Sequence, residues 1–308
     1  MKRNSIIILF IFTLLIIGIP AASFSFNCVN TRFLFHITGD MDQPSDLSDG
    51  PNGNIYIVDG VNNRIVAVDS NGSFKFTFGK EGSGEKEFNM PLGIDVYVDG
   101  RVFVADTRNQ RIQVFDAEGN FLFMFSTKLD SDRNPSDPVD VLVTKFNNGY
   151  IYVSDNNNHE IKVYDLKGKF KFKWGKFGEA SGDFRYPATM SSNANNEVFV
   201  VDVLNTRAQK FSPTGNYIND IGSWGVHPGD FFRPKGIALS HQGWVFVSDS
   251  YMGVVQVFND QGQFDGVICE NNKKRVFKTP VGIFVDKDNR LMVVEMIANK
   301  ITVLKIVE

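Results

Sequence analysis

The sequence predicts an all-β fold, a six-bladed β-propeller with four antiparallel strands in each blade. Three observations support this prediction. A proline followed by an apolar run recurs every 46 to 49 residues, each repeat contains four short strand-like segments, and the last repeat lacks its fourth segment. The repeated prolines are Pro44, Pro91, Pro138, Pro187, Pro234 and Pro280. A period of this length is typical of propellers and other repeat architectures.

The second repeat shows the expected strands most clearly. Residues 91–98, 101–106, 111–116 and 120–125 are rich in Val, Ile, Phe and Tyr, and turn residues such as Asp, Asn and Gly separate them. Such runs predict antiparallel strands joined by tight turns. Because four strands of this length make one propeller blade, we expect the other repeats to follow the same plan.

The two ends of the repeat region predict how the ring closes. The last repeat ends with residues 301–306, which align with the third strands of the other repeats. Residues 32–39 are similar to the fourth strand of the first repeat, which spans 73–79. We therefore expect the N-terminal strand to complete the last blade, an arrangement that leaves no open sheet edge.

The acid that ends each second strand belongs to a recurring group. In the second repeat, Asp106 is followed by Asn109 and Arg111, and the same order appears in the first and fourth repeats. Asp and Asn side chains commonly bind the backbone of turns, so we interpret the group as a turn-building element and not as a catalytic one. Glu160, Val254 and Lys300 replace the arginine in the third, fifth and sixth repeats.

This blade pattern resembles the NHL repeat. The shared segments are Pro-x-Gly-Ile, Val-Phe-Val-x-Asp, Asn-x-Arg-Ile-x-Val-Phe and Gly-x-Phe-x-x-x-Phe-Gly. The resemblance covers residues 27–308 and implies one propeller domain there. Its members include protein binders, RNA binders, ubiquitin-ligase modules and lyases, so the resemblance leaves the function open.

One enzymatic branch of that family can be tested against the sequence. The resemblance to amidating lyases would imply three zinc-binding histidines directly after the first-strand prolines. Those positions hold Ser45, Leu92, Val139, Ala188, Lys235 and Val281. The four histidines, at positions 36, 159, 227 and 241, do not occupy equivalent places in the repeats. Three of them are therefore not expected to meet around one zinc ion.

Residues 1–25 differ from the repeats. Lys2 and Arg3 precede an apolar stretch that runs from Ile6 to Ile19, and small residues follow it. This order is typical of a signal peptide, and the alternative is an uncleaved membrane anchor at residues 5–26. Either reading places the repeats outside the cytoplasm, secreted or tethered, with no membrane contact beyond the N-terminal segment.

Cys28 and Cys269 are the only cysteines. Cys269 is expected at the end of the fourth strand of the fifth blade, and Cys28 before the closing strand, at the opposite face. A six-residue strand spans about 20 Å, which exceeds the Cα separation that a disulfide permits. Only a detour of residues 28–32 could bridge this distance. The sequence therefore predicts two free thiols and no disulfide, although export would allow one.

Candidate ligand-binding residues lie where the first strands begin. These strand starts share one face with the loops from second to third strands, and propeller ligands are usually found there. Asp46, Asp95 and Asp140 could surround the channel mouth with carboxylate oxygens suited to Ca²⁺. The alternative is that they accept hydrogen bonds from backbone amides.

A second, weaker calcium candidate is the loop between the second and third repeats. Asp130, Asp132, Asn134 and Asp137 carry oxygen ligands at alternating positions, as the start of a calcium loop does. Pro135, however, stands where such a loop needs glycine. Apart from this possible calcium, no cofactor is expected.

Composition restricts the partners. The formal net charge is −3, which argues against nucleic acid, because its binding depends on Lys and Arg. Two cysteines are too few for the zinc domain of a ubiquitin ligase. We therefore expect a monomeric, exported scaffold that binds an unidentified protein or small molecule through its channel face, without catalytic residues. The alternatives are a divergent metal-dependent hydrolase or lyase that uses the channel-mouth carboxylates, and a purely structural, tethered surface protein.

Overall fold

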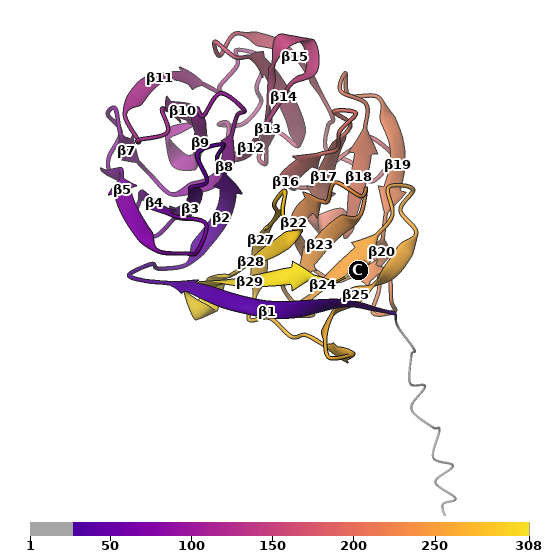
Figure 1. The fold of residues 1–308 in the computed structure, drawn as a ribbon. Helices are drawn as coiled ribbons and strands as arrows, with labels where there is room; N and C mark the ends of the chain where they lie inside the picture. The colour runs from indigo at the N-terminus through magenta and orange to yellow at the C-terminus, as the bar shows by residue number, and fades with distance from the viewer. Residues whose placement is uncertain (1–26, 308) are drawn as a thin grey trace, which may run out of the picture.

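The computed structural model describes residues 27–307, so the predicted signal peptide or anchor at residues 1–25 lies outside it. The chain forms an all-β propeller in which four-stranded antiparallel blades surround a common axis (Figure 1). No helix in the described part has the length and apolar character needed to cross a membrane.

Four of the sheets are separate and have four strands each, paired in chain order. The first contains β2 (Pro44–Asp49), β3 (Ile55–Asp59), β4 (Arg64–Val68) and β5 (Phe74–Phe78), and the second contains β8 (Pro91–Val96), β9 (Val102–Asp106), β10 (Arg111–Phe115) and β11 (Phe121–Ser126). The third contains β12 (Pro138–Thr144), β13 (Tyr150–Asp155), β14 (Glu160–Asp165) and β15 (Phe170–Trp174), and the fourth contains β16 (Pro187–Ser192), β17 (Val198–Asp202), β18 (Arg207–Phe211) and β19 (Tyr217–Ile221). Each sheet begins at one of the repeated prolines, as predicted.

The remaining long strands form one nine-stranded sheet. One group contains β22 (Pro234–Leu239), β23 (Val245–Asp249), β24 (Val254–Phe258), β25 (Phe264–Glu270) and the short β26 (Lys273–Lys274), and the other contains β27 (Pro280–Val285), β28 (Arg290–Glu295), β29 (Lys300–Ile306) and β1 (Cys28–Thr38). The two groups meet where β1 pairs with β25.

Shorter elements connect the blades. Two pairs of two-residue strands lie in parallel between successive sheets: β6 (Lys80–Glu81) with β7 (Glu87–Phe88), and β20 (Ser223–Trp224) with β21 (Asp230–Phe231). Four 3₁₀ turns are η1 (Thr107–Asn109), η2 (Phe146–Asn148), η3 (Val203–Asn205) and η4 (Met296–Ala298). Three of them, η1, η3 and η4, directly follow second strands, which places them on the face where the first strands begin.

The predicted pairing of the two chain ends is confirmed. β1 runs antiparallel to β29, with Arg32 opposite Lys305 and Ile37 opposite Ile301 (Figure 1). The N-terminal strand thus occupies the place of the missing fourth strand, and its buried Ile37 joins the hydrophobic core between this group and the first sheet. A strand from the start of the chain therefore fastens the last repeat.

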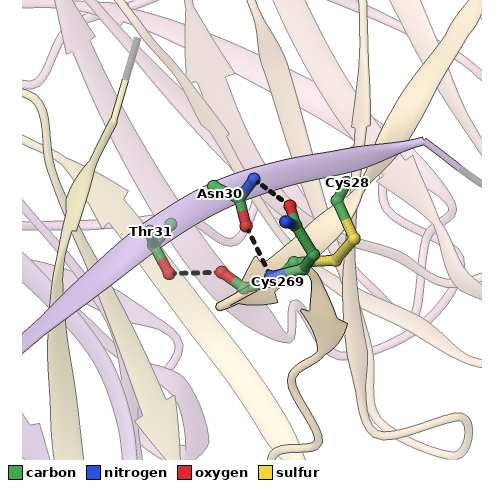
Figure 2. The surroundings of a disulfide bond; sticks show 5 residues. Cys28, Asn30, Thr31 and Cys269 are labelled. Carbon is green, nitrogen blue, oxygen red and sulfur yellow. Dashed lines mark hydrogen bonds between the residues drawn. A yellow bond between two sulfur atoms is a disulfide. The ribbon is translucent and has the colours of Figure 1, made fainter.

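The prediction of free thiols is wrong, because Cys28 and Cys269 form a disulfide with a Cα–Cα distance of 5.4 Å (Figure 2). The expected closing strand began at residue 32, whereas β1 begins at Cys28. Its first three residues extend beyond the pairing with β29, and residues 28–31 run parallel to β25, with Asn30 opposite Cys269. The thiols therefore do not lie at opposite faces.

Hydrogen bonds around the disulfide fix this path of β1. Asn30 and Asn272 exchange two hydrogen bonds of 2.7 and 3.0 Å, and Thr31 Oγ1 donates to Cys269 O at 2.9 Å. Figure 2 shows these contacts side by side with the sulfur bridge. The first residues of β1 are thus bound to the neighbouring group of strands by main-chain, side-chain and covalent contacts together.

The recurring acid, asparagine and arginine build turns, as the sequence predicts. Asn109 Nδ2 donates to both carboxylate oxygens of Asp106, at 3.1 and 2.9 Å, and Arg111 Nε donates to Asp106 Oδ2 at 2.7 Å. Asp106 Oδ1 also accepts from the backbone N–H of Asn89 at 2.8 Å. This fully buried carboxylate therefore ties the end of β9 to the connection that precedes its own blade.

Candidate functional site

The first strand of every repeat lies at the inner end of its group. Successive first strands contact one another, and the last of them contacts the first, so they close a circle around the axis. The six strands are β2, β8, β12, β16, β22 and β27. They enclose a cavity of about 250 Å³, here called the channel cavity, whose lining includes Asp46, Asp95 and Asp140. The structure thus brings the three predicted acids together.

Asp46 and Asp140 link neighbouring sheets inside the channel. Asp46 Oδ2 accepts from the backbone N–H of Ile94 at 3.1 Å, and Asp140 Oδ2 accepts from that of Met190 at 2.6 Å. Each donor belongs to the first strand of the next sheet. These strands have no strand partner on their inner edge, so their amides need other acceptors. The two carboxylates therefore satisfy backbone groups that would otherwise face the channel.

Glycines make room for these two acids. A Cβ on Gly93 would come 2.5 Å from Asp140 Oδ1, and a Cβ on Gly282 would come 2.6 Å from Asp46 Oδ1. Gly93 and Gly282 each occupy, in the preceding repeat, the same position that Asp140 and Asp46 hold. The variation between Gly and Asp at this position therefore follows from packing between neighbouring first strands.

Asp95 makes the same kind of link from a different position in its strand. Its Oδ2 accepts from the backbone N–H of Val143 at 2.7 Å, and its Oδ1 accepts from Ser48 Oγ at 3.1 Å. It therefore joins three consecutive sheets. All three acids follow the alternative reading, in which they bind backbone amides. Each binds an amide of the next repeat, and Asp95 Oδ1 also accepts from the local Val96 N–H at 2.8 Å.

Burial changes the ionisation of this cluster. Burial raises the pKa of Asp46 to about 7, against the opposing effect of the Ile94 and Leu47 amides, and the charge of Asp95 raises it further. Burial likewise raises the pKa of Asp95 to about 6. Burial and the nearby charge of Asp46 raise the pKa of Asp140 well above its usual value. Protonated carboxyl groups can act as proton donors, so the channel can hold protons at neutral pH.

The loop between the second and third sheets does not gather its four predicted calcium ligands. Asp132 is buried and accepts from Lys162 Nζ at 2.7 Å, and Lys162 also donates to Asp155 at 2.5 Å. Asn134 binds Asn157 and Asn158 across the neighbouring turn. Asp130 is exposed, and Asp137 is half-buried directly before β12. The lysine thus supplies the positive charge that a calcium ion would bring to Asp132.

Within residues 27–307, no three or more His, Cys, Asp or Glu side chains are arranged to hold a metal ion. His36 lies on β1 beside Thr302, and His159 Nδ1 accepts from the backbone N–H of Tyr186 at 3.2 Å. The histidines thus lie in different places, as their spacing in the sequence predicts.

A second cavity lies where the first strands begin. This mouth pocket has a volume of about 430 Å³ and is lined by the residue that follows each of the six repeated prolines. Those residues are Ser45, Leu92, Val139, Ala188, Lys235 and Val281. Loop residues such as Asn156 and Tyr186 complete its wall, and Asp46 lies at the boundary with the channel cavity. Four of the six ring positions are apolar, so the pocket is mainly hydrophobic.

Hydrogen bonds hold the rim of the mouth pocket in place. Ser45 Oγ donates to Leu92 O at 2.7 Å, and Thr189 Oγ1 donates to Lys235 O at 2.5 Å. Both bonds run from one first strand to the next, around the axis. These bonds fix the carbonyl groups of Leu92 and Lys235 at the rim of the pocket.

Lys235 is the residue that sequence reasoning missed. Lys235 occupies one of the positions at which histidine is absent, and it is the single charged residue among the six ring positions. Burial, and to a smaller degree the charge of Arg233, lower the pKa of its ammonium group. The sequence contained one indication of this residue: Lys235 is charged, whereas the residue after the proline is apolar or small in the other repeats.

Comparisons with known proteins agree with this architecture. The family model of the NHL repeat matches residues 88–115. A search of curated proteins found no match. A streptogramin B lyase structure is similar over 90% of this chain and 98% of that chain, with 14% identity and a TM-score of 0.64.

Two further solved structures are similar in the same way. Virginiamycin B lyase from Staphylococcus aureus is 14% identical, with a TM-score of 0.63 over 87% of this chain and 82% of that chain. A gluconolactonase from Xanthomonas campestris is 15% identical, with a TM-score of 0.64 over 92% of this chain and 96% of that chain. At this level of identity the likeness supports the propeller fold alone.

Proposed function

The chain carries the NHL repeat on a β-propeller, and from this premise we propose that it is a non-catalytic binding protein that takes a small, mainly apolar ligand in the mouth pocket. The observation that carries the proposal is the pocket of about 430 Å³ formed by all six first strands. Small-ligand pockets typically have volumes of 300–1,000 Å³ and apolar walls with a few polar groups. The mouth pocket has both properties.

The state of the channel acids supports binding over catalysis. Asp46, Asp95 and Asp140 each accept hydrogen bonds from backbone amides of a neighbouring sheet. Carboxylates used in this way hold the ring together. This role accounts for the three acids without a reaction.

The proposal includes the finer architecture and the setting of the protein. We take the nine-stranded sheet as two blades joined by β1, which makes six blades with the four separate sheets. The closed circle of six first strands supports this count. We further propose that the protein is a monomer that does not bind nucleic acid. It is exported with its N-terminal signal peptide cleaved, or it remains tethered to the membrane by the uncleaved segment.

A fluorescence titration with the neutral apolar probe N-phenyl-1-naphthylamine tests the binding function. We expect saturable fluorescence enhancement with one probe per chain. Leu92→Trp should abolish it by filling the mouth pocket, because Leu92 follows Pro91 in the pocket ring. Val98→Trp is the matched control, since Val98 is exposed beyond the other end of the same strand. Equal probe binding by both variants would remove the mouth pocket as the site.

The second candidate is a metal-dependent hydrolase or lyase that uses Asp46, Asp95 and Asp140. The observation in its favour is that three acids with raised pKa values line one cavity, and Asp46 also reaches the mouth pocket. Perturbed pKa values are common at active sites. Metal analysis of the purified protein distinguishes the two candidates: one tightly held divalent ion per chain, lost in Asp140→Asn, would favour the enzyme.

A further inference from the structure

Lys235 has an unusual environment in the mouth pocket. It lies on β22, directly after Pro234, and its half-buried side chain lines an otherwise mainly apolar wall. Among residues 27–307, no carboxylate lies within ion-pair distance of its ammonium group, whereas most other partly buried lysines and arginines on the blades are paired. Taking a charge out of water without a partner is costly, so a ligand anion at this place would be stabilising.

The charged groups around Lys235 leave it as the positive centre of the pocket. Arg233 is exposed and adds a second positive charge outside the pocket. Asp46 is the acid that lines the pocket, but it is bound to the Ile94 amide and its pKa is raised to about 7. The Ser45 and Thr189 hydroxyls donate to carbonyl groups of the rim. Asn156, which donates one bond to Pro187 O, and Tyr186 have side chains with further hydrogen-bond donors. The pocket therefore offers one cation and several donors to a ligand.

The backbone under Lys235 is held in place. Its carbonyl accepts the Thr189 hydroxyl at 2.5 Å. Gly236 packs so closely against the next first strand that a Cβ there would lie 2.0 Å from Val281 O. Because these contacts hold the main chain, the lysine side chain extends from a fixed backbone position. Its ammonium group lies beside an apolar wall, so a ligand that carries an anion next to an apolar body fits both features.

We propose that the mouth pocket is specific for small amphipathic monocarboxylates, with the carboxylate on Lys235 Nζ and the apolar body against Leu92, Val139 and Val281. This inference rests on the proposed binding function. One ammonium group matches the single charge of a carboxylate. A phosphate carries more charge and is usually held by several cationic or backbone donors, which this wall does not provide.

Displacement of bound N-phenyl-1-naphthylamine by a matched pair of ligands tests the inference. Decanoate and decanol share the same chain and differ in charge. A charge-assisted hydrogen bond is roughly twice as strong as a neutral one, so we expect decanoate to displace the probe at a concentration at least ~10-fold lower than decanol. N-acetylphenylalanine and its amide form a second pair, which shows whether a peptide-like body is accepted in place of an aliphatic chain.

The variant Lys235→Met should remove this preference and leave the binding of the neutral probe intact. Lys167→Met is the control, because Lys167 is an exposed lysine in a turn between β14 and β15. Decanoate binding by the wild type should also weaken as the pH rises, both through about 7, where Asp46 in the same pocket gains its charge, and through the lowered pKa of Lys235, while decanol binding stays constant. This pH series does not depend on the folding of any variant.

The outcomes separate the inference from the function on which it rests. If the probe binds but decanoate and decanol compete equally, or Lys235→Met keeps the preference for decanoate, the carboxylate specificity is refuted and the apolar binding function stands. If the wild type does not bind the probe and does not bind either ligand, both proposals fail. A preference for decanoate that disappears in Lys235→Met and at high pH would support both.

Discussion

Replacing Cys28 and Cys269 together by serine removes the covalent bond that joins the N-terminal strand to the neighbouring group of strands. The bridge links residues that are 241 positions apart in the sequence. Because the entropy lost by the unfolded chain grows with the logarithm of loop length, a loop of this size corresponds to about 5 kcal/mol of stabilisation. Residual structure in the unfolded chain lowers this value, so we expect a loss of 2–5 kcal/mol.

Equilibrium denaturant unfolding of the oxidised wild type and the double-serine variant measures this loss. The environment of the bridge provides a matched control: Thr31→Val keeps the disulfide and removes the 2.9 Å hydrogen bond from Thr31 Oγ1 to Cys269 O. A typical hydrogen bond contributes about 1 kcal/mol, so the control should lose less stability than the double-serine variant.

Hydrogen exchange locates the effect. Without the bridge, β1 is held only by hydrogen bonds and packing, so the amides of Arg32–Thr38 should exchange faster than those of β8 or β12 in the same protein. If the free energies of unfolding of the double-serine variant and the oxidised wild type differ by less than about 1 kcal/mol, the disulfide does not stabilise this protein through chain entropy. If β1 retains its protection, the bridge does not secure the end of the ring.

Three further predictions concern single residues of the ring. Asp46 has a folded pKa of about 7 against 3.8 in the unfolded chain, so the folded state binds its proton more tightly. The contribution of Asp46 to stability should be largest below pH 3.8 and should fall by up to about 4 kcal/mol as the pH rises through 7. Thermal melts of Asp46→Asn should lack this part of the pH dependence, and an unchanged slope would contradict it. Gly236→Ala should lower the free energy of unfolding by several kcal/mol, on the order of other severe steric changes, because the added Cβ would lie 2.0 Å from a backbone carbonyl oxygen. Gly39→Ala, with no atom within 4 Å of the added Cβ, should be nearly neutral when both variants are unfolded with denaturant. Lys162→Met should lower the free energy of unfolding by about 3–5 kcal/mol, because it leaves the buried Asp155 carboxylate without its cation. Lys162→Gln introduces the residue found at this place in three other repeats and should lower it less. Equal unfolding free energies for the two variants would refute this reasoning.

Much of the candidate site could be predicted from the sequence, though not its use. The positions of Asp46, Asp95 and Asp140 around the axis follow from their places in the repeat, because repeats in register put equivalent residues at equivalent radii. Their hydrogen bonds between sheets do not follow, since each acid binds a backbone amide of the next sheet. The accessibility of that amide depends on the local shift of register near the start of each first strand. The tertiary structure therefore decides whether these carboxylates bind a cation or backbone amides.

The partners of the acids in the loop at residues 130–137 could not be predicted from the sequence either. Spacing of oxygen-bearing residues at 130–137 suggested a shared ligand, yet Asp132 is bound to Lys162, which lies 30 residues further along the chain. A sequence pattern within one loop carries no information on which distant side chain reaches into it. The charge on Lys162 was visible in the sequence, but its burial was not.

The sequence by itself determined the propeller, its blade plan and the pairing of the N-terminal strand with β29, because strand periodicity and the 46–49-residue interval are local properties that repeat along the chain. The tertiary structure decided the disulfide and the mouth pocket. The disulfide depends on how residues 28–30 extend beyond β29 and pair with β25, a path set by packing between two groups of strands. Lys235 becomes the cation of a pocket because six residues from separate repeats meet at one rim, and such convergence is a property of the closed ring and not of any one repeat.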